Sequence, residues 1–175
     1  FVIARSLVRY GPVVQQLVHR LKYRADTSVV TALIEVVSCC DLSFFADCDL
    51  IIPVPLHRRR LQQRGLNQAL VMGRVFFPEK LAFLRHDGLR RTVNTRSQTR
   101  LSGEERRKNL QDVFSVNSRM SVTYKTVCLV DDVFTTGATA SECSKALLHR
   151  GAKEVRVLTF ARVEVSPHNR KSYLD

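Results

Sequence analysis

The sequence of 175 residues contains only 7 glycines, and their placement excludes two common phosphate-binding motifs. There is no G-x-x-x-x-G-K-[ST] loop and no G-x-G-x-x-G run, so neither a P-loop nor a dinucleotide-binding fingerprint is present. A D-x-D-x-T phosphatase nucleophile is missing too, because Val133 occupies the position of its second acid. The sequence also has no run of about 18 apolar residues, so we predict no membrane-spanning helix.

The 5 cysteines form no C-x-x-C pair, which leaves neither a zinc-binding spacing nor a disulfide framework. Free thiols are typical of a reducing compartment, so a cytoplasmic location is expected. The apolar start of the chain is too short for the core of a signal peptide, because the basic residues Arg5 and Arg9 come directly after it. A chain that begins with Phe1 rather than methionine is expected to be a trimmed piece.

Acidic residues are scarce, with 16 Asp and Glu against 28 Lys and Arg and a formal net charge of +12. Most of the surplus lies in residues 56–108, which contain 14 basic and 4 acidic side chains. A solvated surface would spread its charge more evenly. This concentration therefore indicates a polyanionic ligand, either a pyrophosphate group or a nucleic-acid backbone.

Residues 127–139 combine a strand pattern with a polar loop. Residues 127–130 are apolar on both faces, as in a buried parallel strand, and Asp131 and Asp132 follow at its carboxyl end, where open α/β sheets bind ligands. Two residues further on, residues 135–139 at the start of a predicted helix offer a turn-forming glycine, hydroxyl donors and a favourable helix dipole. We expect these loop residues to hold a phosphate: Thr135, Thr136, Gly137, Ala138 and Thr139.

The two carboxylates suit a different task from the loop. Asp131 and Asp132 are placed to accept hydrogen bonds from vicinal hydroxyls or to share a hydrated Mg²⁺. The expected ligand is therefore a sugar phosphate with the shape of ribose 5-phosphate. The alternative is a strand that ends in a solvated turn, with a threonine capping the helix.

The hydrophobic pattern predicts an α/β fold with a doubly wound, mainly parallel sheet flanked by helices. Residues 1–163 are expected to form one domain and residues 164–175 a polar tail. Helices are expected at 12–24, 28–37, 103–110 and 139–150. A further helix is expected to open with residues 64–68 and to stop at Pro78. Strands are expected at 50–52, 89–93, 114–116, 127–130 and 155–160, with an exposed hairpin at 115–124.

A second polar loop follows the strand at 50–52, where Pro53 and Pro55 end the strand and arginines come next. If this strand lies beside residues 127–130, a cationic loop faces the phosphate loop across one crevice. The alternative is a solvated, charge-rich turn.

Residues 127–139 resemble the signature of type I phosphoribosyltransferases: an apolar strand, two acids, two variable residues and Thr-Thr-Gly-Ala-Thr. A longer likeness, from about Tyr10 to Arg162, is to the ComF/GntX family of phosphoribosyltransferase-like proteins. It rests on Leu21-Lys22-Tyr23, Pro53-Val54-Pro55-Leu56-His57, Arg60, Arg64-Gly65-Leu66-Asn67-Gln68, Arg91, Gln98, Leu101, Arg106, Asn109 and Phe114. Members are linked to natural competence and the use of external DNA. Many carry an N-terminal four-cysteine zinc module, which this sequence lacks.

The resemblance implies binding of phosphoribosyl pyrophosphate (PRPP), with the acids at the ribose, the loop at the 5-phosphate and Mg²⁺ near Asp131 and Asp132. It implies a transferase that displaces pyrophosphate from C1, where the protein supplies positioning and charge compensation. The residues expected at the pyrophosphate are His57, Arg58, Arg59 and Arg64. Those expected in a flexible hood loop are Arg91, Arg96, Gln98 and Arg100. Nothing in the sequence identifies the acceptor.

Two other functions stay open. One is a PRPP sensor or adaptor that has this fold but does not catalyse the transfer. The other is a single-stranded DNA-binding protein that acts in transformation with competence or recombination proteins. The basic segment has few aromatic residues between its arginines, which disfavours a base-stacking platform but allows contacts to phosphates.

Overall fold

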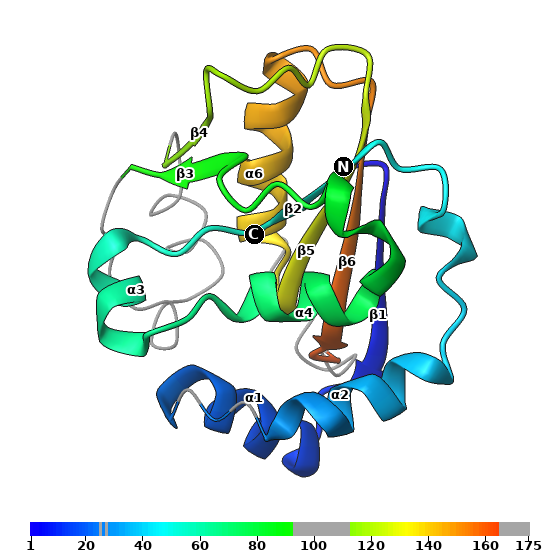
Figure 1. Ribbon diagram of the computed structural model, residues 1–175, viewed down its shortest axis with the longest axis vertical. Coiled ribbons are helices and arrows are strands. Elements are labelled where there is room, and N and C mark those ends of the chain that lie inside the picture. The colour runs from blue at the N-terminus through cyan, green and yellow to red at the C-terminus, as the bar shows by residue number, and fades with distance from the viewer. Residues whose placement is uncertain (25, 27, 93–112, 165–175) are drawn as a thin grey trace, which may run out of the picture.

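The computed structural model describes residues 1–24, 26, 28–92 and 113–164. Its central four-stranded sheet has the order β1 (Ile3–Arg9), β6 (Glu154–Arg162), β5 (Thr126–Phe134) and β2 (Leu50–Pro53) (Figure 1). All neighbouring strands of this sheet are parallel. A separate antiparallel pair consists of β3 (Leu89–Arg91) and β4 (Phe114–Val116). The mainly parallel α/β fold predicted from the sequence is confirmed.

Helices connect the strands. In chain order they are α1 (Pro12–Arg24), α2 (Val29–Ser38), α3 (Arg58–Arg64), α4 (Gln68–Phe76) and α6 (Ala138–His149), with 3-10 turns η1 (Ser43–Phe45) and η2 (Pro78–Phe83). Of the described helices, none has the length and apolarity that a bilayer crossing requires.

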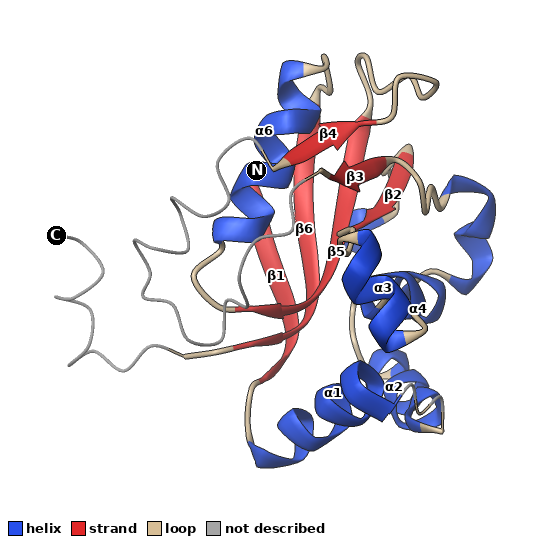
Figure 2. Ribbon diagram, turned by 90° about the vertical axis from the view of Figure 1, so that its left-hand side faces the viewer, coloured by secondary structure: helices blue, strands red, loops and turns tan. Residues whose placement is uncertain are grey.

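Helices cover both faces of the sheet (Figure 2), and each face carries a separate hydrophobic core. Val127 and Leu129 of β5 pack with α6 and the β3–β4 pair. Cys128 and Val130 pack with α1, α2 and α4 on the other face. Because side chains alternate along a strand, β5 must be apolar at every position to fill both cores, which explains its uninterrupted apolar run.

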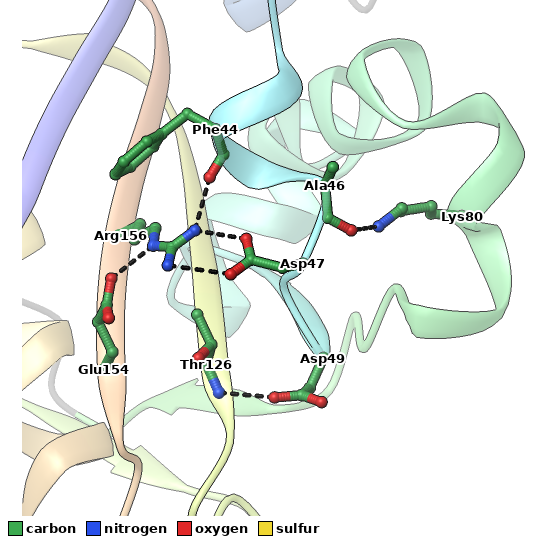
Figure 3. Close-up of polar contacts among 8 residues, drawn as sticks. All are labelled: Phe44, Ala46, Asp47, Asp49, Lys80, Thr126, Glu154 and Arg156. Atoms are coloured by element: carbon green, nitrogen blue, oxygen red, sulfur yellow. Dashed lines mark hydrogen bonds and ion pairs between the residues drawn. The ribbon is translucent and has the colours of Figure 1, made fainter.

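The end of the sheet where β5 and β6 begin is fastened by polar contacts (Figure 3). The Arg156 guanidinium donates to the Phe44 carbonyl oxygen at 2.6 Å and to both carboxylate oxygens of Asp47 at 2.6 and 3.2 Å. The Thr126 amide donates to the Asp49 carboxylate at 2.8 Å. These contacts tie the segment around η1 to the sheet at its amino end.

The structure differs from the predicted strands in two places. Strand β1 was not predicted, although it hydrogen-bonds along most of its length with β6. The hairpin predicted at 115–124 is absent, because β4 pairs with β3 and the residues after β4 form turns in which Asn117 and Val122 are buried. Both strands pair with segments far away in the sequence, which a local pattern does not report.

Strand β5 is longer than predicted. It continues through Asp131 and Asp132 to Phe134 because β6 keeps pairing with it, with Asp131 opposite Thr159. The two acids therefore lie within β5 rather than past its end. Strand β2 stops earlier, with Pro53 opposite Val130, so the acids come just after the last pair between β2 and β5.

Several predictions fall outside the described residues. They include the hood residues Arg96, Gln98 and Arg100, the helix at 103–110, and all of the tail except Glu164.

Candidate functional site

A cavity of about 290 Å³ opens where β5 extends beyond β2. The loop after β2 and the loop after β5 both line it, since the two strands are adjacent and parallel. Side chains of α1, α3, α4 and β3 complete the wall. The crevice predicted between the cationic loop and the phosphate loop is therefore present.

The loop after β5 is shaped by Gly137. Its φ of 75° lies in the left-handed region, and a Cβ there would stand 2.7 Å from Cζ of Phe134. Glycine alone satisfies both conditions. Helix α6 then begins at Ala138, and the lining includes Thr135, Gly137, Ala138 and Thr139. Thr136 does not line the cavity, and its hydroxyl accepts a 3.4 Å hydrogen bond from the Ala138 amide.

This loop presents the amino terminus of a 12-residue helix to the cavity. The helix dipole and the first backbone N–H groups favour an anion at such a position. Such a position, with threonine hydroxyls beside it, is chemically suited to an anion such as a phosphate group.

The two acids lie on opposite faces of β5, as alternation along a strand requires. Asp131 has the orientation of Leu129 and lies on the side of α6, where it interacts electrostatically with Cys143. Asp132 has the orientation of Val130 and lies on the side of α1, where it contacts Lys22. Both acids nevertheless line the cavity, one from each side.

Asp131 has an unusual protonation equilibrium. Burial raises the pKa of Asp131 to about 8, and repulsion from the neighbouring Asp132 adds to the shift. The attraction of Lys22 and a hydrogen bond from the Asp132 amide offset only part of it. This shift favours the protonated form of Asp131 near neutral pH, and an arriving cation would displace the proton.

Asp132 forms an ion pair with Lys22 of α1, between Oδ2 and Nζ. The Lys22 side chain is 25% exposed and the Asp132 side chain 13%. Burial alone would lower the pKa of Lys22, but the charge of Asp132, its hydrogen bond and the charge of Asp131 together raise that pKa. The other carboxylate oxygen of Asp132 accepts a 2.9 Å hydrogen bond from the Val133 amide.

Three arginines form the cationic wall of the cavity. Arg60 and Arg64 come from α3 and Arg91 from β3. Burial, together with repulsion from Arg60, lowers the pKa of Arg91 to about 10. Burial and the nearby Arg64 lower the pKa of Arg60. Guanidinium groups that repel one another in a partly buried cavity create a site for a multiply charged anion.

Arg64 is held in place by two neighbours. Its Nη1 donates to Oε1 of Gln68 at 3.2 Å, and its guanidinium lies 5.4 Å from the centre of the Tyr23 ring. Both neighbours also line the cavity. A cationic side chain fixed in this way needs little rearrangement to receive a phosphate group.

The structure sorts the residues predicted at the pyrophosphate into two groups. Arg64 lines the cavity, whereas His57, Arg58 and Arg59 do not. His57 caps α3 by accepting the Arg59 amide hydrogen at its Nδ1. Arg58 and Arg59 are exposed.

Among the residues that line the cavity without a role predicted from the sequence are Lys22, Tyr23 and Arg60. All three lie within the segments that resemble the ComF/GntX family. A helical reading of residues 58–64 would have identified Arg60, because i and i+4 share one face of a helix and Arg60 therefore lies beside Arg64.

A bound Mg²⁺ fits this site only in part. Among the described residues, no group of three or more His, Cys, Asp or Glu side chains converges. Mg²⁺ commonly keeps several waters and binds one or two carboxylates together with substrate phosphates, so Asp131 suits an ion that arrives with a diphosphate. Asp132 suits it less, because the Lys22 ammonium already contacts Oδ2.

The sequence is similar to those of several bacterial proteins. Over 115 residues the chain is 38% identical to competence protein F of Haemophilus influenzae, a match that covers 65% of this chain and 50% of that protein. Over 162 residues it is 32% identical to DNA utilization protein YhgH of Escherichia coli O157:H7, which covers 90% of this chain and 70% of that protein. Competence protein ComFC of Bacillus subtilis is 28% identical over 160 residues, or 91% of this chain and 63% of that protein.

The chain thus spans about half the length of competence protein F and somewhat more of the other two relatives. No family model matches it. A solved purine phosphoribosyltransferase from Pyrococcus horikoshii is similar with a TM-score of 0.40 and 16% identity, over 93% of this chain and 87% of that one. A structural likeness this distant carries no functional argument.

Proposed function

The chain belongs to the ComF/GntX family, and from that premise we propose that it binds PRPP as a phosphoribosyltransferase-like protein of competence and DNA utilization. One observation carries the proposal. A helix amino terminus, two carboxylates and three arginines converge on one cavity at the carboxyl side of two adjacent parallel strands. PRPP has an anionic group, a diol and a second, more highly charged anionic group in that order.

The residues divide the ligand among them. The loop from Thr135 to Thr139 and the start of α6 receive the 5-phosphate. Asp131 and Asp132 accept hydrogen bonds from the ribose hydroxyls. Arg60, Arg64 and Arg91 face the pyrophosphate and bind its oxygens. Arginine suits this task because its planar guanidinium makes paired contacts to phosphate.

In the proposed reaction, the bond from C1 of the ribose to pyrophosphate breaks and a bond to a nitrogen acceptor forms. The carboxylates then lie close to the positive charge that develops on the ring, and the arginines stabilise the departing anion. When bound, Mg²⁺ supplies further positive charge to the diphosphate oxygens, and Asp131 is the residue that would hold it. The acceptor is a nitrogen nucleophile of unassigned identity.

A screen for pyrophosphate release separates a transferase from a sensor. The protein is incubated with PRPP, Mg²⁺ and a panel of nucleobases, amines and single-stranded oligonucleotides. Release with one acceptor, absent without it, supports the transferase. PRPP binding by calorimetry without release for any acceptor supports the sensor. No PRPP binding at all would overturn the proposed function.

Single-stranded DNA binding is a second candidate function. Arg58 and Arg59 are exposed on α3 and do not line the cavity, so they remain accessible to another polyanion. A nucleic-acid backbone is bound through such contacts without regard to sequence. In this role the outer face of α3 would hold DNA while the inner face serves the cavity.

A further inference from the structure

The ion pair between Lys22 and Asp132 connects α1 to the candidate site across 110 positions of sequence. Lys22 lies in the last turn of α1, where a positive charge is favoured by the helix dipole. The adjacent Leu21 and the preceding Val18 are buried in the core between α1 and the sheet. The packing of α1 thus fixes the backbone from which Lys22 reaches Asp132.

Both carboxylate oxygens of Asp132 are engaged. Oδ2 contacts the Lys22 ammonium and Oδ1 accepts the Val133 amide hydrogen at 2.9 Å. A divalent cation at Oδ2 would meet the ammonium at short range, where like charges repel strongly in a partly buried site. Displacing the ammonium would leave the partly buried charge of Lys22 without its partner, which is unfavourable.

We propose that Lys22 is a positioning residue that supplies the counter-charge of Asp132, so that Asp132 acts as a hydroxyl acceptor and a divalent cation is confined to Asp131. Lys22 takes the place that a metal ion would otherwise have at the second carboxylate. It also fixes the direction in which Asp132 presents its oxygens to the cavity. The part of this role that concerns the ribose rests on the proposed PRPP binding, whereas the exclusion of a metal ion from Asp132 does not.

A metal titration without PRPP tests the exclusion directly. Binding of Mn²⁺, a paramagnetic substitute for Mg²⁺, is followed by the electron paramagnetic resonance signal of the free ion. Lys22→Gln removes the charge but keeps a hydrogen-bond donor for Asp132. We expect Lys22→Gln to bind Mn²⁺ at least about tenfold more tightly than the wild type, because the positive charge that repels a cation from Asp132 is gone.

Three further variants act as controls. Lys22→Arg keeps the positive charge and should bind Mn²⁺ as weakly as the wild type. Lys145→Gln removes an exposed lysine that pairs with Glu142 on α6, and it should also match the wild type. Adding Asp132→Asn to Lys22→Gln should abolish the gain. Circular dichroism verifies that each variant is folded.

An unchanged Mn²⁺ affinity in folded Lys22→Gln would overturn the proposal, as would a gain that survives Asp132→Asn. Lys22→Met provides a second neutral variant if Lys22→Gln folds poorly. Calorimetry of the wild type with PRPP separates this outcome from the proposed function. A gain in Mn²⁺ affinity without PRPP binding would support the proposed role of Lys22 and refute the proposed PRPP binding. PRPP binding without a gain in Mn²⁺ affinity would support PRPP binding and refute the proposed role of Lys22.

Discussion

Gly137 shows how a single residue shapes the candidate site. Gly137 and Gly65 have nearly the same backbone angle, with φ of 75° and 74°. They differ in space, because a Cβ at Gly137 meets the Phe134 ring at 2.7 Å and a Cβ at Gly65 meets nothing within 4 Å. The two positions therefore separate backbone strain from steric contact.

We predict that Gly137→Ala is more destabilising than Gly65→Ala. Both substitutions place alanine in the left-handed region at roughly 1–2 kcal/mol, and Gly137→Ala also pushes the Phe134 ring out of its position. Urea unfolding of both variants measures the difference. Equal losses of unfolding free energy would show that the Phe134 contact has no energetic weight.

The raised pKa of Asp131 predicts that the stability of the protein depends on pH. The folded protein raises its pKa from 3.8 to about 8, so between these values the native state binds a proton that the unfolded chain has released. The contribution of Asp131 to the free energy of unfolding is therefore fully present below pH 3.8, and it is lost as the pH rises towards 8.

We therefore expect the free energy of unfolding of the metal-free wild type, relative to that of Asp131→Asn, to fall between pH 5 and pH 8. Denaturant unfolding in EDTA at several pH values measures both proteins. Parallel pH profiles for the two proteins would contradict the shifted pKa.

At this scale the sequence predicted the acids and the phosphate loop because they are contiguous. Strand, acids, glycine and threonines stand within thirteen residues, and their order alone indicates a ligand. It did not assign Lys22 to the site, since the pair with Asp132 exists only after α1 packs against the sheet. No local pattern encodes that contact.

The helical conformation of α3 determines the direction in which each of its arginines points. Read as a turn, residues 58–64 present all their arginines equally. Read as a helix, they direct Arg60 and Arg64 to the cavity and leave Arg58 and Arg59 exposed. The helical periodicity therefore decides which arginines face the cavity.

This division predicts two separable losses. We expect Arg60→Gln with Arg64→Gln to weaken PRPP binding about a hundredfold or more, because each loses a charge-assisted phosphate contact of about 1.5–3 kcal/mol. Arg58→Gln with Arg59→Gln should leave PRPP affinity within about twofold, as expected for exposed substitutions. Calorimetry compares the pairs, and the reverse ranking would place the pyrophosphate on the outer face of α3.

The outer arginines carry the DNA prediction. If single-stranded DNA binds there, Arg58→Gln with Arg59→Gln should reduce the slope of log affinity against log salt by about 1.4, or 0.7 for each lost phosphate contact. Fluorescence anisotropy with a labelled oligonucleotide measures the slope. An unchanged slope would exclude this face as the DNA surface.

Strands β1 and β5 show the limit of local patterns for elements. The apolar run of β5 was predicted, but its extension through the acids depends on pairing with β6. Strand β1 interrupts its apolar residues with Arg5 and Ser6 and lies at the edge of the sheet, so it lacks the pattern of a buried strand.

For the whole molecule, the architecture follows from β5 being apolar on both faces. Such a strand requires a helical layer on each side, and the amphipathic segments at 12–24, 28–37 and 139–150 provide them. The pairing of β3 with β4 was beyond prediction because it joins segments separated by residues 92–113. The overall charge indicated a polyanion, and the structure divides the arginines of α3 between a cavity and an outer surface.

The central claim is that the cavity binds PRPP through Asp131 and Asp132, and isothermal titration of PRPP with Mg²⁺ tests it most directly. Glu142→Gln is the control, since Glu142 lies on α6 without lining the cavity. We predict binding to the wild type and to Glu142→Gln, and none to the protein with Asp131→Asn and Asp132→Asn. Unchanged PRPP affinity in that folded double variant would contradict the account.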